Sequence, residues 1–133
     1  MNACFADTHF YLALLSEKDE DHERALALDQ SLDSAMVTTE WVLTEVADAL
    51  SAPACRGLVL ELIEALGDDV GVLVQPATHE LFERGLHLYS ERFDKGWSLT
   101  DCISFVVMQD QGIQDALTAD HHFEQAGFRA LLR

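Results

Sequence analysis

The chain has 133 residues, of which 49% are hydrophobic and 24% charged, and its formal net charge is −16. This length suits a sizeable core, so we expect residues 1–133 to form a single domain. The chain lacks the cluster of basic residues that is usual in nucleic-acid-binding proteins, because it has only eight scattered lysines and arginines against 24 acids. Either nucleic acid is not the partner, or cations supply the missing positive charge.

Apolar runs and amphipathic segments alternate along the whole chain. In chain order we predict strand 2–7, helix 8–16, helix 19–32, strand 35–39, helix 40–50, helix 56–66, strand 70–76, helix 79–93, helix 98–111, strand 115–119, helix 121–127 and strand 128–132. This alternation is typical of an α/β fold whose parallel sheet is covered by helices on both faces. In such sheets ligands bind beyond the carboxyl ends of the strands, so the residues there are of most interest.

The cysteines and the N-terminus indicate a cytoplasmic protein. Cys4 and Cys102 lie in apolar stretches and are expected in the core, and no CxxC pair is present. Asp7 interrupts the first apolar run, which argues against a signal peptide. No apolar run approaches the roughly 18 residues that a membrane span requires, so we expect no membrane association.

Two aspartates follow predicted strands. Asp7 ends the first strand and Asp120 comes after the fourth, so both are expected at the carboxyl edge of the sheet. Each also precedes a predicted helix, and an N-cap role explains either residue by itself.

Glu45 lies inside the helix that follows the second strand. The apolar stripe of this helix is predicted to comprise Val42, Val46, Ala49 and Leu50. At about 100° per residue, Glu45 lies roughly 40° beyond Ala49 and borders the core. The alternative is a boundary carboxylate whose head lies in water.

Asp101 lies in the first turn of an apolar helix. With Ser98 it fits the capping-box pattern, which explains an acid here without any function. A capping role does not exclude metal binding by the free carboxylate oxygen.

Together the four acids predict more than each does alone. One parallel fold can bring them into a single cleft, where four carboxylates repel each other unless cations lie between them. Hard oxygen ligands suit Mg²⁺ or Mn²⁺. Such a cluster is a common means of in-line attack on a phosphodiester.

Four segments carry a family resemblance: FADTHFYLALL, TTEWVLTEVADAL, DKGWSLTDCISFVVMQ and ALTADHHFEQAGF. They resemble the signatures of PIN domains, in particular the VapC-like ribonuclease toxins of prokaryotic toxin–antitoxin pairs. The resemblance implies a three-layer αβα sandwich with a central parallel sheet of about five strands. It also implies an Mg²⁺- or Mn²⁺-dependent endoribonuclease that hydrolyses RNA, forms homodimers and is inhibited by a cognate antitoxin.

By motif, the resemblance assigns the catalytic, metal-binding quartet to Asp7, Glu45, Asp101 and Asp120. Polar neighbours that it marks as supporting or substrate contacts are Thr8, Ser98 and Thr118, with Asp94 as a candidate outer carboxylate. The alternative is a non-catalytic PIN-like binding or scaffold module, against which the complete quartet argues. The charge of −16 leaves open how so acidic a chain holds an RNA backbone.

His121 and His122 begin the last predicted helix. We interpret this pair as a solvated helix start, with His121 nearer to the cleft. Trp41 and Trp97 each flank a quartet residue, and both fit core positions better than an interface.

Overall fold

A five-stranded parallel sheet forms the centre of the molecule, in the order β3-β2-β1-β4-β5. The computed structural model describes residues 2–133, so Met1 of the predicted domain lies outside the described residues. The strands are β1 (Ala3–Ala6), β2 (Ala35–Thr39), β3 (Val72–Gln75), β4 (Asp115–Leu117) and β5 (Arg129–Ala130).

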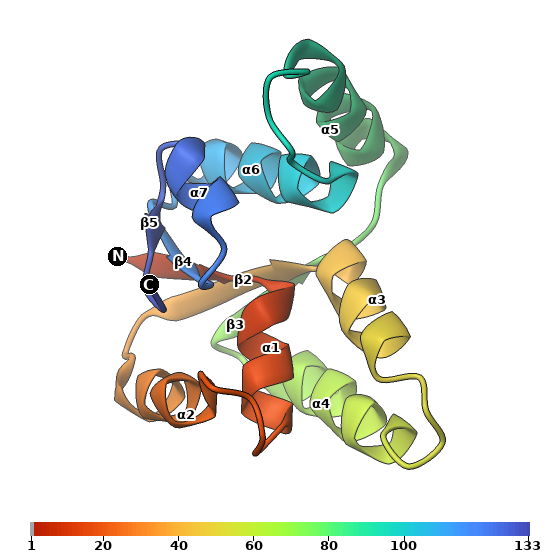
Figure 1. The fold of residues 1–133 in the computed structure, drawn as a ribbon, viewed down its shortest axis with the longest axis vertical. Helices are drawn as coiled ribbons and strands as arrows, with labels where there is room; N and C mark the ends of the chain where they lie inside the picture. The colour runs from red at the N-terminus through yellow and green to blue at the C-terminus, as the bar shows by residue number, and fades with distance from the viewer. Residues whose placement is uncertain (1) are drawn as a thin grey trace.

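Helices cover both faces of this sheet. They are α1 (Thr8–Leu15), α2 (His22–Ser31), α3 (Glu40–Ala49), α4 (Arg56–Asp68), α5 (His79–Glu91), α6 (Leu99–Gln111) and α7 (His121–Gln125). Helices α5, α6 and α7 lie above the sheet in Figure 1 and α1, α2 and α4 below it, with α3 beside α1 and α4. This arrangement confirms the predicted αβα sandwich.

The strand order creates a crevice at one edge of the sheet. The chain runs from β1 outward through β2 to β3, and then crosses back to β4 on the other side of β1. The border between β1 and β4 is therefore a topological switch point, where open α/β sheets bind ligands beyond the strand ends. Asp7 directly follows β1 and Asp120 follows β4.

Aromatic packing fixes α6 and α7 over this border. Phe105 of α6 meets Phe123 of α7 edge-on with ring centroids 4.9 Å apart, and Trp97 meets Phe105 at 5.1 Å. Phe5 of β1 lies 6.4 Å from Phe123. Because these rings are buried, the helices that carry Asp101 and Asp120 have fixed positions relative to β1.

Two features of the predicted helices require correction. The helix predicted at 19–32 begins at His22, because the Asp19 side chain accepts the Asp21 N–H at 2.8 Å and forms a turn. In α3, Val42 and Val46 are buried as predicted, but Leu43 is buried in addition and Ala49 is exposed. Helix α3 packs against α1 and α4 as well as β2, which buries Leu43.

Cys4 and Cys102 are buried, as predicted, and no disulfide joins the cysteines of residues 2–133. Within the same residues, no helix combines the length and apolar character needed to cross a bilayer.

Candidate active site

A cavity of about 520 Å³ lies beyond the carboxyl ends of β1 and β4. All four predicted carboxylates line it, so the fold brings together residues from four separate elements. The lining residues are Asp7, Thr8, His9, Leu12, Glu45, Gly96, Ser98, Asp101, Ala119, Asp120 and His122. We call this space the acid cavity.

Asp7 is the most buried acid of the cavity, with 5% of its surface exposed. It occupies the N-cap position of α1, but its side chain makes no capping hydrogen bond. Instead, the Thr118 hydroxyl donates to Asp7 Oδ2 at 2.9 Å. Burial raises the pKa of Asp7 to about 7, with smaller increases from Asp101 and Glu45 and an opposing effect of the Thr118 hydrogen bond. The capping interpretation therefore does not account for this acid.

Asp101 caps its helix and also faces the cavity. Its backbone N–H donates to Ser98 Oγ at 3.0 Å, and its Oδ2 accepts the Ser98 N–H at 3.1 Å, which completes the predicted capping box. The same Oδ2 lies 3.1 Å from Nδ1 of His122. Burial raises the pKa of Asp101, and the nearby Asp120 adds to the increase. Among residues 2–133, Oδ1 of Asp101 has no hydrogen-bond partner and is available to a ligand.

Asp120 is the N-cap of α7. Its Oδ1 accepts the His122 N–H at 2.9 Å, as the capping interpretation predicts. Its own N–H donates to Thr118 Oγ1 at 3.0 Å. Since the Thr118 hydroxyl also donates to Asp7, this buried threonine links the two aspartates across the β1–β4 border.

Glu45 enters the cavity from α3. It is half-buried, and Thr8 Oγ1 donates to its Oε1 at 2.6 Å. The N-cap Thr39, whose hydroxyl accepts the Val42 N–H, starts α3 directly after β2 and so brings Glu45 to the same edge as Asp7. Thr8 therefore orients Glu45 as Thr118 orients Asp7.

Four carboxylates concentrate negative charge in the acid cavity. Within residues 2–133, none of the four carboxylates pairs with a lysine or arginine; only His121 and His122 approach them. Asp120, His121 and His122 each offer a ligand atom within 4.8 Å of the others. Hard oxygen donors, uncompensated negative charge and a buried acid of raised pKa together fit a divalent cation.

Sequence reasoning misjudged two details of this site. His122, not His121, lines the cavity, since His121 is exposed, and His9 also contributes, with its Nε2 2.8 Å from Asp21 Oδ2. Asp94 is not among the lining residues, and its exposed carboxylate pairs with Arg92. The five-residue α7 is too short for periodicity to show which histidine faces inward.

Comparisons with known proteins agree with this geometry. The PIN domain family model matches residues 4–129. The 23S rRNA-specific endonuclease VapC20 of Mycobacterium tuberculosis is 31% identical over 124 residues, which cover 93% of this chain and 94% of that protein.

Solved structures give the same result. The crystal structure of the M. tuberculosis VapC20, a Sarcin-Ricin loop cleaving toxin, superposes with a TM-score of 0.85 at 28% identity and covers 94% of this chain and 95% of its own. FitAcB from Neisseria gonorrhoeae has a TM-score of 0.67 at 15% identity, covers 96% of this chain and 95% of its own, and supports the fold alone. The chain therefore belongs to the PIN domain family.

Proposed function

We propose that this protein is a metal-dependent endoribonuclease that hydrolyses RNA phosphodiester bonds and acts as the toxin of a type II toxin–antitoxin pair. One observation carries the proposal: four carboxylates line one cavity at the switch point of the sheet, and no lysine or arginine among residues 2–133 pairs with them. The similarity to a 23S rRNA-specific endonuclease over nearly the full length supports the same activity.

Asp7, Asp101 and Asp120 would hold Mg²⁺ or Mn²⁺, and Glu45 would complete the set directly or through a water. When bound, such an ion supplies a nucleophilic water at neutral pH and offsets charge on the phosphoryl oxygens. The choice of Mg²⁺ or Mn²⁺ is part of the proposal, and the oxygen donors of the acid cavity support it.

The remaining polar residues act by keeping the acids in position. Thr118 holds Asp7 relative to Asp120, and Thr8 holds Glu45. Ser98 and His122 share one oxygen of Asp101, which leaves the other oxygen facing the cavity. This pre-arrangement lowers the cost of assembling like charges at the moment of reaction.

The substrate and partners follow from the relatives. We propose ribosomal RNA as the first substrate to test, because the matched endonuclease is specific for 23S rRNA. A cognate antitoxin, a homodimer, a cytoplasmic location and a single domain over residues 1–133 belong to the same proposal.

Cleavage of labelled 23S rRNA and of total RNA by the purified full chain tests the proposal. We expect cutting with Mg²⁺ or Mn²⁺, no cutting in EDTA, and loss of cutting in Asp120→Asn. Asp48→Asn is the matched control, because Asp48 is exposed on α3 and is not among the residues lining the acid cavity. Absence of cutting by folded, antitoxin-free protein would favour a non-catalytic PIN module instead.

A further inference from the structure

A second cavity, of about 490 Å³, opens beside the acid cavity. We call it the aromatic cavity; it is lined by Tyr89, Arg92, Phe93, Lys95, Gly96, Trp97 and Cys102. Gly96 lines both cavities, so the two cavities are neighbours at the α5–α6 connection. Its volume lies within the roughly 300–1,000 Å³ of small-ligand sites, which is enough for a nucleotide-sized group.

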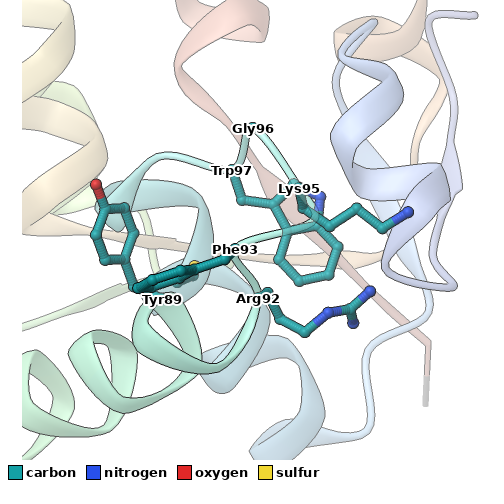
Figure 2. A pocket seen from close by; sticks show the side chains of 7 residues that line it. Tyr89, Arg92, Phe93, Lys95, Gly96 and Trp97 are labelled. Atoms are coloured by element: carbon teal, nitrogen blue, oxygen red, sulfur yellow. The ribbon is translucent and has the colours of Figure 1, made fainter.

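The aromatic cavity holds an unpaired cation in a chain that has few. Among residues 2–133, five of the eight lysines and arginines pair with carboxylates: Arg24, Arg84, Arg92, Arg129 and Arg133. Lys95 has no such partner there, and it is next in the chain to the shared Gly96. Figure 2 shows Lys95 and Arg92 extending to one side of Trp97, with Tyr89 on the opposite side.

The aromatic residues of the cavity differ in exposure. Trp97 is buried and fixed, since its Nε1 donates to Gln125 Oε1 at 3.0 Å and the Arg92 guanidinium lies 4.7 Å from its ring centroid. Phe93, just beyond the end of α5, is 91% exposed. A large exposed aromatic ring beside a fixed wall and a free ammonium is typical of surfaces that stack nucleobases.

We propose that the aromatic cavity is a nucleotide subsite, which binds single-stranded RNA next to the cleaved phosphodiester by stacking a base on Phe93 and pairing a phosphate with Lys95. The inference rests on the proposed ribonuclease function and deepens it. The subsite would explain how a chain of net charge −16 retains RNA, because a positive charge and an aromatic ring for stacking lie close to the acid cavity.

Charge and position favour RNA over a protein as the occupant. Lys95 lines a cavity that shares Gly96 with the acid cavity, where a polyanion would be cut. A second copy of the chain is the competing occupant, because Phe82, Leu86 and Tyr89 form an exposed apolar stripe along α5 that leads to Phe93. The experiment below separates the two occupants.

Anisotropy of a fluorescein-labelled, mixed-sequence single-stranded RNA of about 12 nucleotides measures binding. The parent is the full chain carrying Asp7→Asn, which prevents cleavage, in Mg²⁺. We expect Phe93→Ala to weaken binding about tenfold or more, the loss of one stacked base. Lys95→Ala should reduce the slope of log affinity against log salt by about 0.7, the value for one single-strand phosphate contact.

Matched controls come from the same chain. Phe82→Ala removes an exposed phenylalanine within α5. Lys18→Ala removes an exposed lysine that follows the C-terminal end of α1, the end opposite Thr8. Both should bind RNA as the parent does. Light scattering of each variant reports its oligomeric state.

Three results would overturn the subsite. The first is no RNA binding by the parent. The second is parental affinity and salt slope in both Phe93→Ala and Lys95→Ala. The third is an equal loss of RNA binding and of a dimer in Phe82→Ala and Phe93→Ala.

Cleavage by the unmutated chain separates failure of the subsite from failure of the proposed function. If the unmutated chain cuts RNA but binding does not depend on Phe93 or Lys95, the subsite is refuted and the ribonuclease function stands. If RNA binding depends on Phe93 and Lys95 but the unmutated chain does not cut RNA, the ribonuclease function is refuted and the subsite stands.

Discussion

Asp101 occupies the first turn of α6, where Ser98 accepts its N–H and His122 contacts its carboxylate. The capping role and the proposed catalytic role can be separated by mutation. Asp101→Asn should reduce RNA cleavage about 100-fold or more, because a charged oxygen facing the cavity is lost. Ser98→Ala removes the hydroxyl that caps α6 but keeps the backbone N–H that contacts Asp101 Oδ2. It should cost about 1 kcal/mol of unfolding free energy while cleavage continues. Cleavage assays and thermal unfolding measure both; equal activity loss with equal destabilisation would make Asp101 a cap only.

The raised pKa of Asp7 predicts that the stability of the protein depends on pH. Burial raises its pKa to about 7 from 3.8, so the folded state holds a proton that the unfolded chain releases between these values. The metal-free protein should therefore lose stability as pH rises from about 4 to about 7. Asp7→Asn removes this loss, and in EDTA it should stabilise the protein by a few kcal/mol at pH 8 and little at pH 4. Denaturant unfolding across pH measures this; a pH-independent effect would be contrary to a buried, uncompensated carboxyl.

Single residues were predictable where residue type and position agreed. An aspartate after a buried strand predicted the location of Asp7 and Asp120, and the Ser98–Asp101 spacing predicted the capping box. The contact of His122 with Asp101 was not predictable, because it depends on how α7 packs against α6. The separation of Asp94 from the acid cavity depends likewise on its pairing with Arg92.

At the scale of elements, the close packing of α5 on α6 depends on Gly85. A Cβ at Gly85 would overlap Cγ1 of Ile103 and lie 3.2 Å from its backbone. Gly85→Ala should therefore destabilise the protein by about 1–3 kcal/mol, despite the better helix propensity of alanine. Gly57→Ala, in α4 with nothing within 4 Å of the added Cβ, should be neutral or slightly stabilising. Thermal unfolding compares the two; equal effects would show that the close approach is unimportant.

Strand and helix order was predictable because hydrophobic periodicity changes clearly between elements. Element edges were not, because side chains such as Asp19 set them locally. The buried face of α3 depended on contacts with α1 and α4, which no local pattern reports. The aromatic cavity likewise arises only when the α5–α6 connection folds beside the acid cavity.

At the scale of the whole molecule, a charge of −16 opposes the approach of RNA. In our two proposals the opposing positive charge is concentrated at one place, with a divalent cation among the four acids and Lys95 in the neighbouring cavity. Composition alone could not predict this arrangement, because it depends on where the strand order of the sheet reverses, between β1 and β4.

The most direct test of the acid cavity as a cation site is thermal unfolding of the metal-free chain as Mn²⁺ is added at pH 8. Binding to the folded state should raise Tm by about 3–8 °C at saturating Mn²⁺. Asp7→Asn should lose most of this rise, while the control Asp48→Asn should keep it. An equal rise in all three proteins, or no rise in the unmutated chain, would contradict a cation centre formed by these carboxylates.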